Sequence, residues 1–134
     1  MASETVQIAT KASPDFVWDA IRDIGALHTR LVPGFVVQTE LEPGARIVTF
    51  GNGMIVREPI IALDEDRRRL VWSAEGAGLS HYNASVQVFA TQGGSQVVWI
   101  ADFLPDSASE QVKCMMQEGI SALKTTMDKA AETS

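Results

Sequence analysis

Arg57 and Glu58 are adjacent charged residues in a segment that otherwise has the pattern of a β-strand. Side chains of neighbouring strand residues point to opposite faces of a sheet, so one of the two charges must face inward. Alternation alone cannot choose between them. Val56, Ile60 and Ala62 share the parity of Glu58 and are apolar enough for Glu58 to be the inward residue, while Arg57 stays the alternative. A carboxylate in a protein interior is paired, hydrated or protonated, and in each state it can bind a ligand hydroxyl or carbonyl.

Arg46 is the expected ion-pair partner of Glu58. It lies on the preceding predicted strand, across the turn Gly51-Asn52-Gly53. Two interpretations of the pair stay open at this point. The pair either lines an internal cavity and orients a ligand, or it is a structural ion pair on the convex surface of the sheet.

His81 and Tyr82 follow the turn Gly76-Ala77-Gly78 and are expected at the mouth of a cavity. An imidazole titrates near neutral pH and a phenol can donate a hydrogen bond, so both suit a site; simple exposure is the alternative for His81. His28 has no acidic or nucleophilic partner within reach in the sequence. Cys114 is the single cysteine, so no internal disulfide forms, and without His or Cys at ligand spacing we expect neither a metal site nor a cofactor.

The N-terminal elements that would position these groups are a strand and two short helices. Residues 4–11 alternate polar and apolar side chains, which predicts a strand. Ser13-Pro14-Asp15 supplies a helix cap followed by proline, which predicts a short helix to about residue 22. A second helical piece is expected over residues 26–31, before Pro33-Gly34.

Residues 35–103 form strand-like segments separated by turn signals, and six strands are predicted there. A long helix follows from about residue 108 to 130. One antiparallel sheet of seven strands with one long helix is an α+β architecture, and residues 1–134 form a single domain. The turns are read at Glu42-Pro43-Gly44, Gly51-Asn52-Gly53, Asp64-Glu65-Asp66, Gly76-Ala77-Gly78 and Gln92-Gly93-Gly94.

Alternation also predicts which strand residues face the helix, since polar and apolar residues take turns along each segment. The clearest case is residues 82–88, where Asn83, Ser85 and Gln87 mark the wet side. The predicted inward set is Val37, Thr39, Leu41, Val56, Glu58, Ile60, Trp72, Ala74, Tyr82, Ala84, Val86, Val88, Trp99, Ala101 and Phe103.

Gly119 stands inside the long helix, where glycine is up to about 1 kcal/mol less favourable than alanine, so a local reason is expected. The glycine either leaves room for a ligand or lets the helix pack closely on Trp99 or Trp72. The helix residues expected at the cavity are Met116, Gly119, Ile120 and Leu123.

Several local motifs accompany this order of elements. They are Ala12-Ser13-Pro14-Asp15 with Val17-Trp18, Gly44-Ala45-Arg46, the run from Arg57 to Asp64, and Val98-Trp99 before Asp102 and Pro105. Together they resemble the START-like superfamily, which includes pollen-allergen-like proteins, polyketide cyclases and plant abscisic-acid receptors. The resemblance implies a helix-grip fold, with the sheet wrapped around the terminal helix and a cavity for a small hydrophobic ligand between them. In the abscisic-acid receptors a glutamate matching Glu58 contacts ligand.

Three functions fit this architecture. The first is binding of a small hydrophobic or amphipathic metabolite, lipid- or polyketide-like, in a pocket of about 300–1,000 Å³ with Glu58, Arg46, Tyr82 and His81 as polar anchors. The second is a polyketide cyclase or dehydratase that uses the same four groups as acids and bases. The third is a receptor whose loops close over ligand, which Gly51-Asn52-Gly53 makes doubtful because this turn is shorter than the gate of the plant receptors.

The net charge of −6, from 17 acidic and 11 basic residues, disfavours nucleic acid as a partner. The sequence shows no signal-peptide pattern and no long apolar run, so we expect a cytoplasmic protein without membrane insertion. A homodimer is left open.

Overall fold

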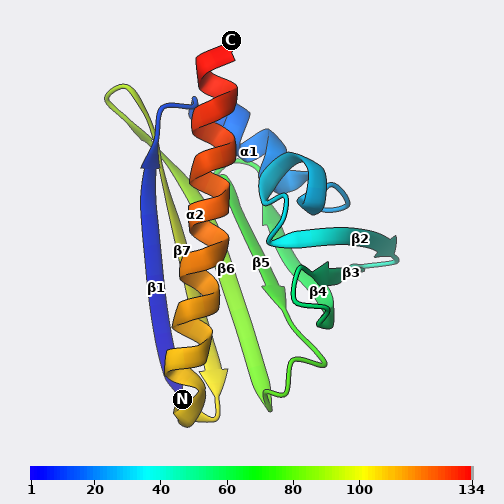
Figure 1. Cartoon of the computed structure of the whole chain (residues 1–134). Helices are drawn as coiled ribbons and strands as arrows, with labels where there is room; N and C mark the ends of the chain where they lie inside the picture. The colour runs from blue at the N-terminus through cyan, green and yellow to red at the C-terminus, as the bar shows by residue number, and fades with distance from the viewer. Residues whose placement is uncertain (134) are drawn as a thin grey trace.

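The computed structural model describes residues 1–133, which form seven strands and two main helices (Figure 1). The strands are β1 (Ala2–Thr10), β2 (Val36–Glu42), β3 (Ala45–Phe50), β4 (Ile55–Asp64), β5 (Arg69–Ser73), β6 (His81–Thr91) and β7 (Gly94–Leu104). The helices are α1 (Pro14–Arg22), the π-helical turn η1 (Leu27–Leu31), the 3-10 turn η2 (Asp106–Ala108) and α2 (Ser109–Thr133).

The seven strands form one antiparallel sheet in the order β1-β7-β6-β5-β4-β3-β2. Figure 1 shows α2 running along one face of the sheet, with α1 and η1 near the end where α2 finishes. The predicted α+β helix-grip fold, with two short helical pieces after the first strand, is therefore confirmed.

Helix α1 begins where the sequence predicts. Ser13 caps it, because its hydroxyl accepts a hydrogen bond from the Phe16 amide at 3.2 Å, and Pro14 occupies the first turn, where no amide partner is needed. The Trp18 side chain is buried, and its Nε1 donates to Glu65 Oε1 at 2.7 Å. This bond ties α1 to the turn between β4 and β5.

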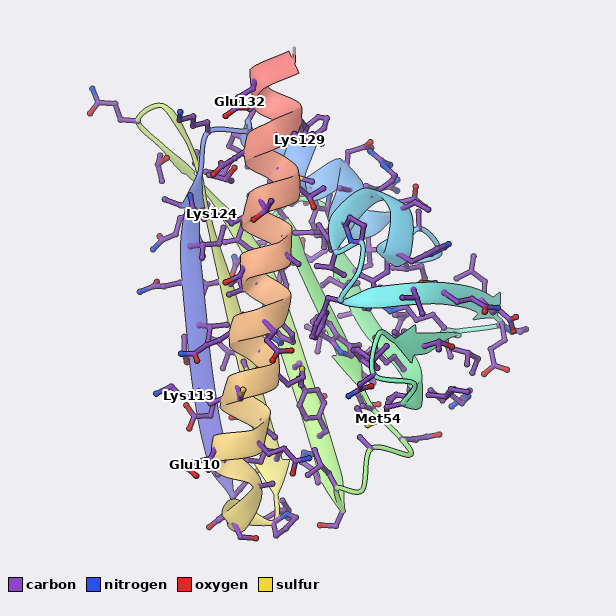
Figure 2. The ribbon with its side chains drawn as sticks, in the orientation of Figure 1. Met54, Glu110, Lys113, Lys124, Lys129 and Glu132 are labelled. Carbon is purple, nitrogen blue, oxygen red and sulfur yellow. The ribbon has the colours of Figure 1, made fainter. Side chains whose placement is uncertain are left out.

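Helix α2 buries one apolar stripe against the sheet: Val112, Met116, Ile120, Leu123 and Met127. Near its C-terminal end it is also bound to the end of β1. Asp128 Oδ1 accepts hydrogen bonds from the Thr10 hydroxyl at 2.6 Å and the Lys11 amide at 3.0 Å. Lys124, labelled in Figure 2 on the flank toward β1, donates to the Ala9 carbonyl.

The edge strand β2 departs from the prediction. Val37 and Leu41 were expected inside, but they are 54% and 61% exposed, and Val36 is buried instead. A register shift between Val36 and Gln38 interrupts the alternation there. Leu41 does share the face of its partner Arg46, but it lies outside the core, with its side chain beside Gly25.

A second register shift lies in β4, between Ile60 and Ala62. Ala62 was assigned the inward parity of Glu58, but it is exposed. Ile60 pairs with Trp72 and packs against the core. The inward parity therefore ends at Ile60.

Candidate functional site

A cavity of about 100 Å³ lies between the sheet and α2. Its wall is almost wholly apolar, and it reaches the surface where half-buried residues such as Met54, Leu79 and Met115 line it. Figure 2 shows Met54 in the turn between β3 and β4. The volume is below the expected 300–1,000 Å³, because large rings project inward: the Trp72 and Trp99 ring centroids are 6.2 Å apart.

A buried ion pair forms the polar part of the wall. Arg46 and Glu58 stand directly opposite each other on β3 and β4, and Arg46 Nε donates to Glu58 Oε1 at 2.8 Å. Their side chains are only 3% and 9% exposed, and the Arg46 guanidinium lies 5.5 Å from the centre of the Trp72 ring. The structure thus places the pair on the inner face and not on the convex surface.

Arg57 takes the opposite face, as alternation requires. It is half-exposed, with Nε 2.6 Å from Glu42 Oε1 and Nη1 3.2 Å from Glu75 Oε2. Backbone hydrogen bonds also run both ways between Arg57 and Glu75. This outer cluster fixes the start of the loop that carries Ala77 and Leu79 over the cavity.

Burial shifts the pKa values of two groups at the cavity. Burial raises the pKa of the Glu58 carboxyl, and the charge and hydrogen bond of Arg46 oppose this only in part. Burial also raises the pKa of the Tyr82 phenol above its ordinary value, which already lies well above neutrality, and the nearby charge of Glu58 adds to the shift. Tyr82 is therefore a neutral phenol throughout the physiological pH range.

Trp99 brings a polar atom that has no partner. Its indole Nε1 is buried and donates no hydrogen bond to any described side chain or backbone group. The N–H lies near the Tyr82 phenol and counteracts the rise of its pKa, but its geometry falls short of a hydrogen bond. A buried donor left unpaired is unfavourable by about 1–3 kcal/mol.

His81 does not belong to this site. It precedes Tyr82 on β6 and therefore points to the other face, where it is exposed. The structure does not bring His81 to the cavity.

Gly119 packs closely on Trp99, which is one of the two interpretations offered from the sequence. It lines the cavity, and a Cβ atom there would lie 2.8 Å from the Trp99 ring and 2.9 Å from the Phe35 ring. The glycine therefore lets α2 approach these two aromatic rings.

The cavity gathers part of the predicted set. The predicted residues that line it are Arg46, Val56, Glu58, Trp72, Tyr82, Val86, Trp99, Gly119 and Leu123. The predicted residues that do not line it are Ile60, His81, Ala84, Ala101, Phe103, Met116 and Ile120. Apart from His81, those in the second group pack in the core, so they face inward without bordering the free space.

Several lining residues were missed because they come from η1 or from connections, where strand alternation does not apply. They include Leu27, Leu31, Val32, Phe35, Met54, Ala77 and Leu79. On α2 the lining methionine is Met115 and not Met116, since Met116 is fully buried in the packed stripe. Apolar side chains beside turn glycines, such as Phe35 after Gly34, were the available signal.

The comparisons with known proteins agree with the fold. A sequence profile for a family described as "Polyketide cyclase / dehydrase and lipid transport" matches residues 1–128. No curated protein matches in sequence.

Solved structures resemble the whole chain. An uncharacterized protein from Bacillus thuringiensis has a TM-score of 0.85 at 21% identity, covering 94% of this chain and 98% of that one. A START superfamily protein from Mycobacterium smegmatis has a TM-score of 0.72 at 11% identity, covering 98% and 97%. The di-domain ARO/CYC BexL from the BE-7585A biosynthetic pathway has a TM-score of 0.78 at 15% identity, covering 94% of this chain and 46% of that one. These likenesses establish the fold.

Within the described part of the chain, no cluster of three or more His, Cys, Asp or Glu side chains has the arrangement of a metal site. None of the described helices combines the length and apolar character needed to cross a bilayer.

Proposed function

The chain belongs to the polyketide cyclase / dehydrase and lipid transport family, and from this premise we propose that it binds a small apolar or amphipathic molecule in the cavity between the sheet and α2. The observation that carries the proposal is an apolar cavity with the buried Arg46–Glu58 pair in its wall. Apolar residues of similar volume usually stabilise a core at least as well as a buried ion pair does. The position of this pair beside free space therefore supports a role in ligand binding.

Ligand binding should raise the melting temperature. At a ligand concentration 100 times Kd the native state gains about 2.7 kcal/mol, which raises Tm by several degrees in a domain of this size. The measurement is a thermal-shift titration with a panel of uncharged molecules graded in size, from monocyclic ketones and phenols to longer-chain lipids. Quenching or shift of tryptophan fluorescence gives a second readout, because Trp72 and Trp99 both line the cavity.

A matched pair of variants separates cavity binding from surface binding. Ala74 lines the cavity, whereas Ala62 is exposed, so Ala74→Leu fills the cavity and Ala62→Leu is its control. The proposal expects Ala74→Leu to abolish the shift in Tm and Ala62→Leu to retain it. If Ala74→Leu fails to fold, Ala77→Leu in the covering loop takes its place. No shift with any panel member, or equal shifts in both variants, would contradict binding in this cavity.

Proton transfer on a bound molecule is the second candidate, and the raised pKa of the Glu58 carboxyl is the observation that favours it. The other groups support it less: Tyr82 has a pKa too high to release its proton, and His81 lies on the other face. For a substrate identified from the panel, this candidate expects Glu58→Gln to remove turnover while binding persists. Turnover unchanged in Glu58→Gln would exclude Glu58 from the chemistry.

A further inference from the structure

Among the side chains of residues 1–132, Trp99 Nε1 is the one nitrogen or oxygen atom that is buried without a hydrogen-bond partner, since the nearby Tyr82 phenol does not meet the geometry of a hydrogen bond. An indole N–H donates and cannot accept, so the partner that it lacks is an acceptor. Trp18 provides a contrast within the same chain, because its Nε1 donates to Glu65 Oε1 at 2.7 Å. The Trp99 indole, unlike that of Trp18, lines the cavity.

The charges at the cavity limit what this acceptor can be. Arg46 already engages Glu58, so its charge is not free to balance a ligand anion. The rest of the wall is apolar apart from the neutral Tyr82, and the burial that raises the pKa of Glu58 would also disfavour a ligand carboxylate. The acceptor that fits is therefore a neutral oxygen.

The size of the cavity limits the rest of the molecule. An apolar cavity of about 150 Å³ holds benzene, so one of about 100 Å³ admits a compact molecule no larger than a single ring unless side chains move outward. A long acyl chain or a polycyclic skeleton exceeds that space.

We infer that the cavity binds a compact uncharged molecule whose carbonyl or ether oxygen accepts a hydrogen bond from Trp99 Nε1. The inference rests on the proposed function and narrows its ligand class. Neighbouring atoms cover Nε1 in this arrangement, so the oxygen reaches it when a lining side chain moves aside. Met115 also lines the cavity, and its flexible thioether can adopt another rotamer at little cost.

The test uses two probes of the same shape, cyclopentanone and methylenecyclopentane, of which only the ketone has an oxygen acceptor. Indole N–H signals are followed by ¹⁵N–¹H correlation spectra, with Trp18 as the internal reference because its N–H is bound to Glu65. The inference expects the ketone to move the Trp99 signal downfield, the hydrocarbon to leave it nearly unchanged, and Trp18 to stay in place. Trp99→Phe identifies the signal and should weaken ketone binding about three- to tenfold without weakening hydrocarbon binding.

The outcomes separate this inference from the proposed function. If the ketone shifts the Met115 methyl signal but not the Trp99 N–H signal, binding stands and the hydrogen bond is refuted. If Trp99→Phe weakens both probes equally, the indole acts through packing and the inference is also overturned. If larger panel members bind and neither probe does, the compact ligand class is wrong and the proposed function survives. If nothing binds, both fail.

Discussion

Replacing Arg46 with methionine tests the buried ion pair directly. Methionine keeps an unbranched apolar side chain of similar reach, but it removes the only cation bonded to Glu58 among residues 1–133. The Glu58 carboxylate, 9% exposed, is then left in the protein interior without a counter-charge. It either remains ionised at a high energetic cost or takes up a proton.

The expected loss at neutral pH is large. Breaking a buried pair by removing one partner reduces the free energy of unfolding by about 3–5 kcal/mol. Roughly 1 kcal/mol of this is the contact of the guanidinium with the Trp72 ring, which does not depend on pH. Domains usually have about 5–15 kcal/mol of stability, so the variant should remain folded at neutral pH if it starts above the lower end of that range.

Acid should relieve most of the loss. Burial raises the pKa of Glu58 in the folded protein, and without Arg46 nothing near it lowers that pKa. A carboxyl whose folded pKa lies above its unfolded value favours folding fully below the unfolded pKa of about 4.5, and this contribution is lost as pH rises through the folded value. The gap between Arg46→Met and the parent should therefore narrow to about 1 kcal/mol near pH 4 and widen toward pH 8.

Urea denaturation followed by tryptophan fluorescence, from pH 4 to pH 8, measures this gap. Arg57→Met is the control, because Arg57 is 42% exposed and bonded to Glu42 and Glu75, so it should lose about 1 kcal/mol or less. A loss under 1 kcal/mol for Arg46→Met, or a gap that does not change with pH, would refute the view of Glu58 as a buried carboxylate held by Arg46.

Three further predictions concern stability. Gly119→Ala should lower the free energy of unfolding by about 1 kcal/mol in a thermal melt, because the steric cost of a Cβ against the Trp99 ring exceeds the gain in helix propensity. An unchanged Tm would mean that the Trp99 ring moves aside at little cost. The parent should lose stability as pH falls from about 3.8 toward the folded pKa of Asp128, about 2, and Asp128→Asn should flatten that slope in acid urea titrations; equal slopes would contradict the assignment. Trp18→Phe removes the hydrogen bond to Glu65 and should lower the free energy of unfolding by about 1–2 kcal/mol in urea denaturation; an unchanged free energy would show that this bond does not stabilise the fold.

The sequence predicted the polar pair well. Glu58 and Arg57 are neighbours with opposite parity, and both sides carry apolar residues, Val56 and Ile60 with Glu58 and Ile55 and Ile61 with Arg57. Alternation alone therefore could not choose between the two charges, and the resemblance to the START-like superfamily favoured Glu58. Because the connection between β3 and β4 is short, Arg46 could be placed near Glu58, and the two are direct register partners. Turn signals thus suffice to bring residues of neighbouring strands opposite each other where the strands are regular.

The extent of the cavity could not be predicted in the same way. Ala84 and Val86 both face inward on β6, but only Val86 borders free space, because the difference depends on how opposing side chains fill the interior. Leu79 and Phe35 reach the cavity from irregular segments, for which no periodicity exists. The register shift beside Val36 reversed the expected exposure at the edge of the sheet.

The strand order has a consequence for folding during synthesis. β1 pairs only with β7, whose residues are made about 90 positions later, so the first strand leaves the ribosome long before its hydrogen-bonding partner exists. The hairpins from β2 to β6 can pair as they emerge. The pairing of β1 with β7 joins the residues of the sheet that are farthest apart in the sequence, and such long-range contacts form slowly. A nascent chain halted before residue 94 should therefore expose β1 to proteases and chaperones, even with the middle of the sheet already assembled.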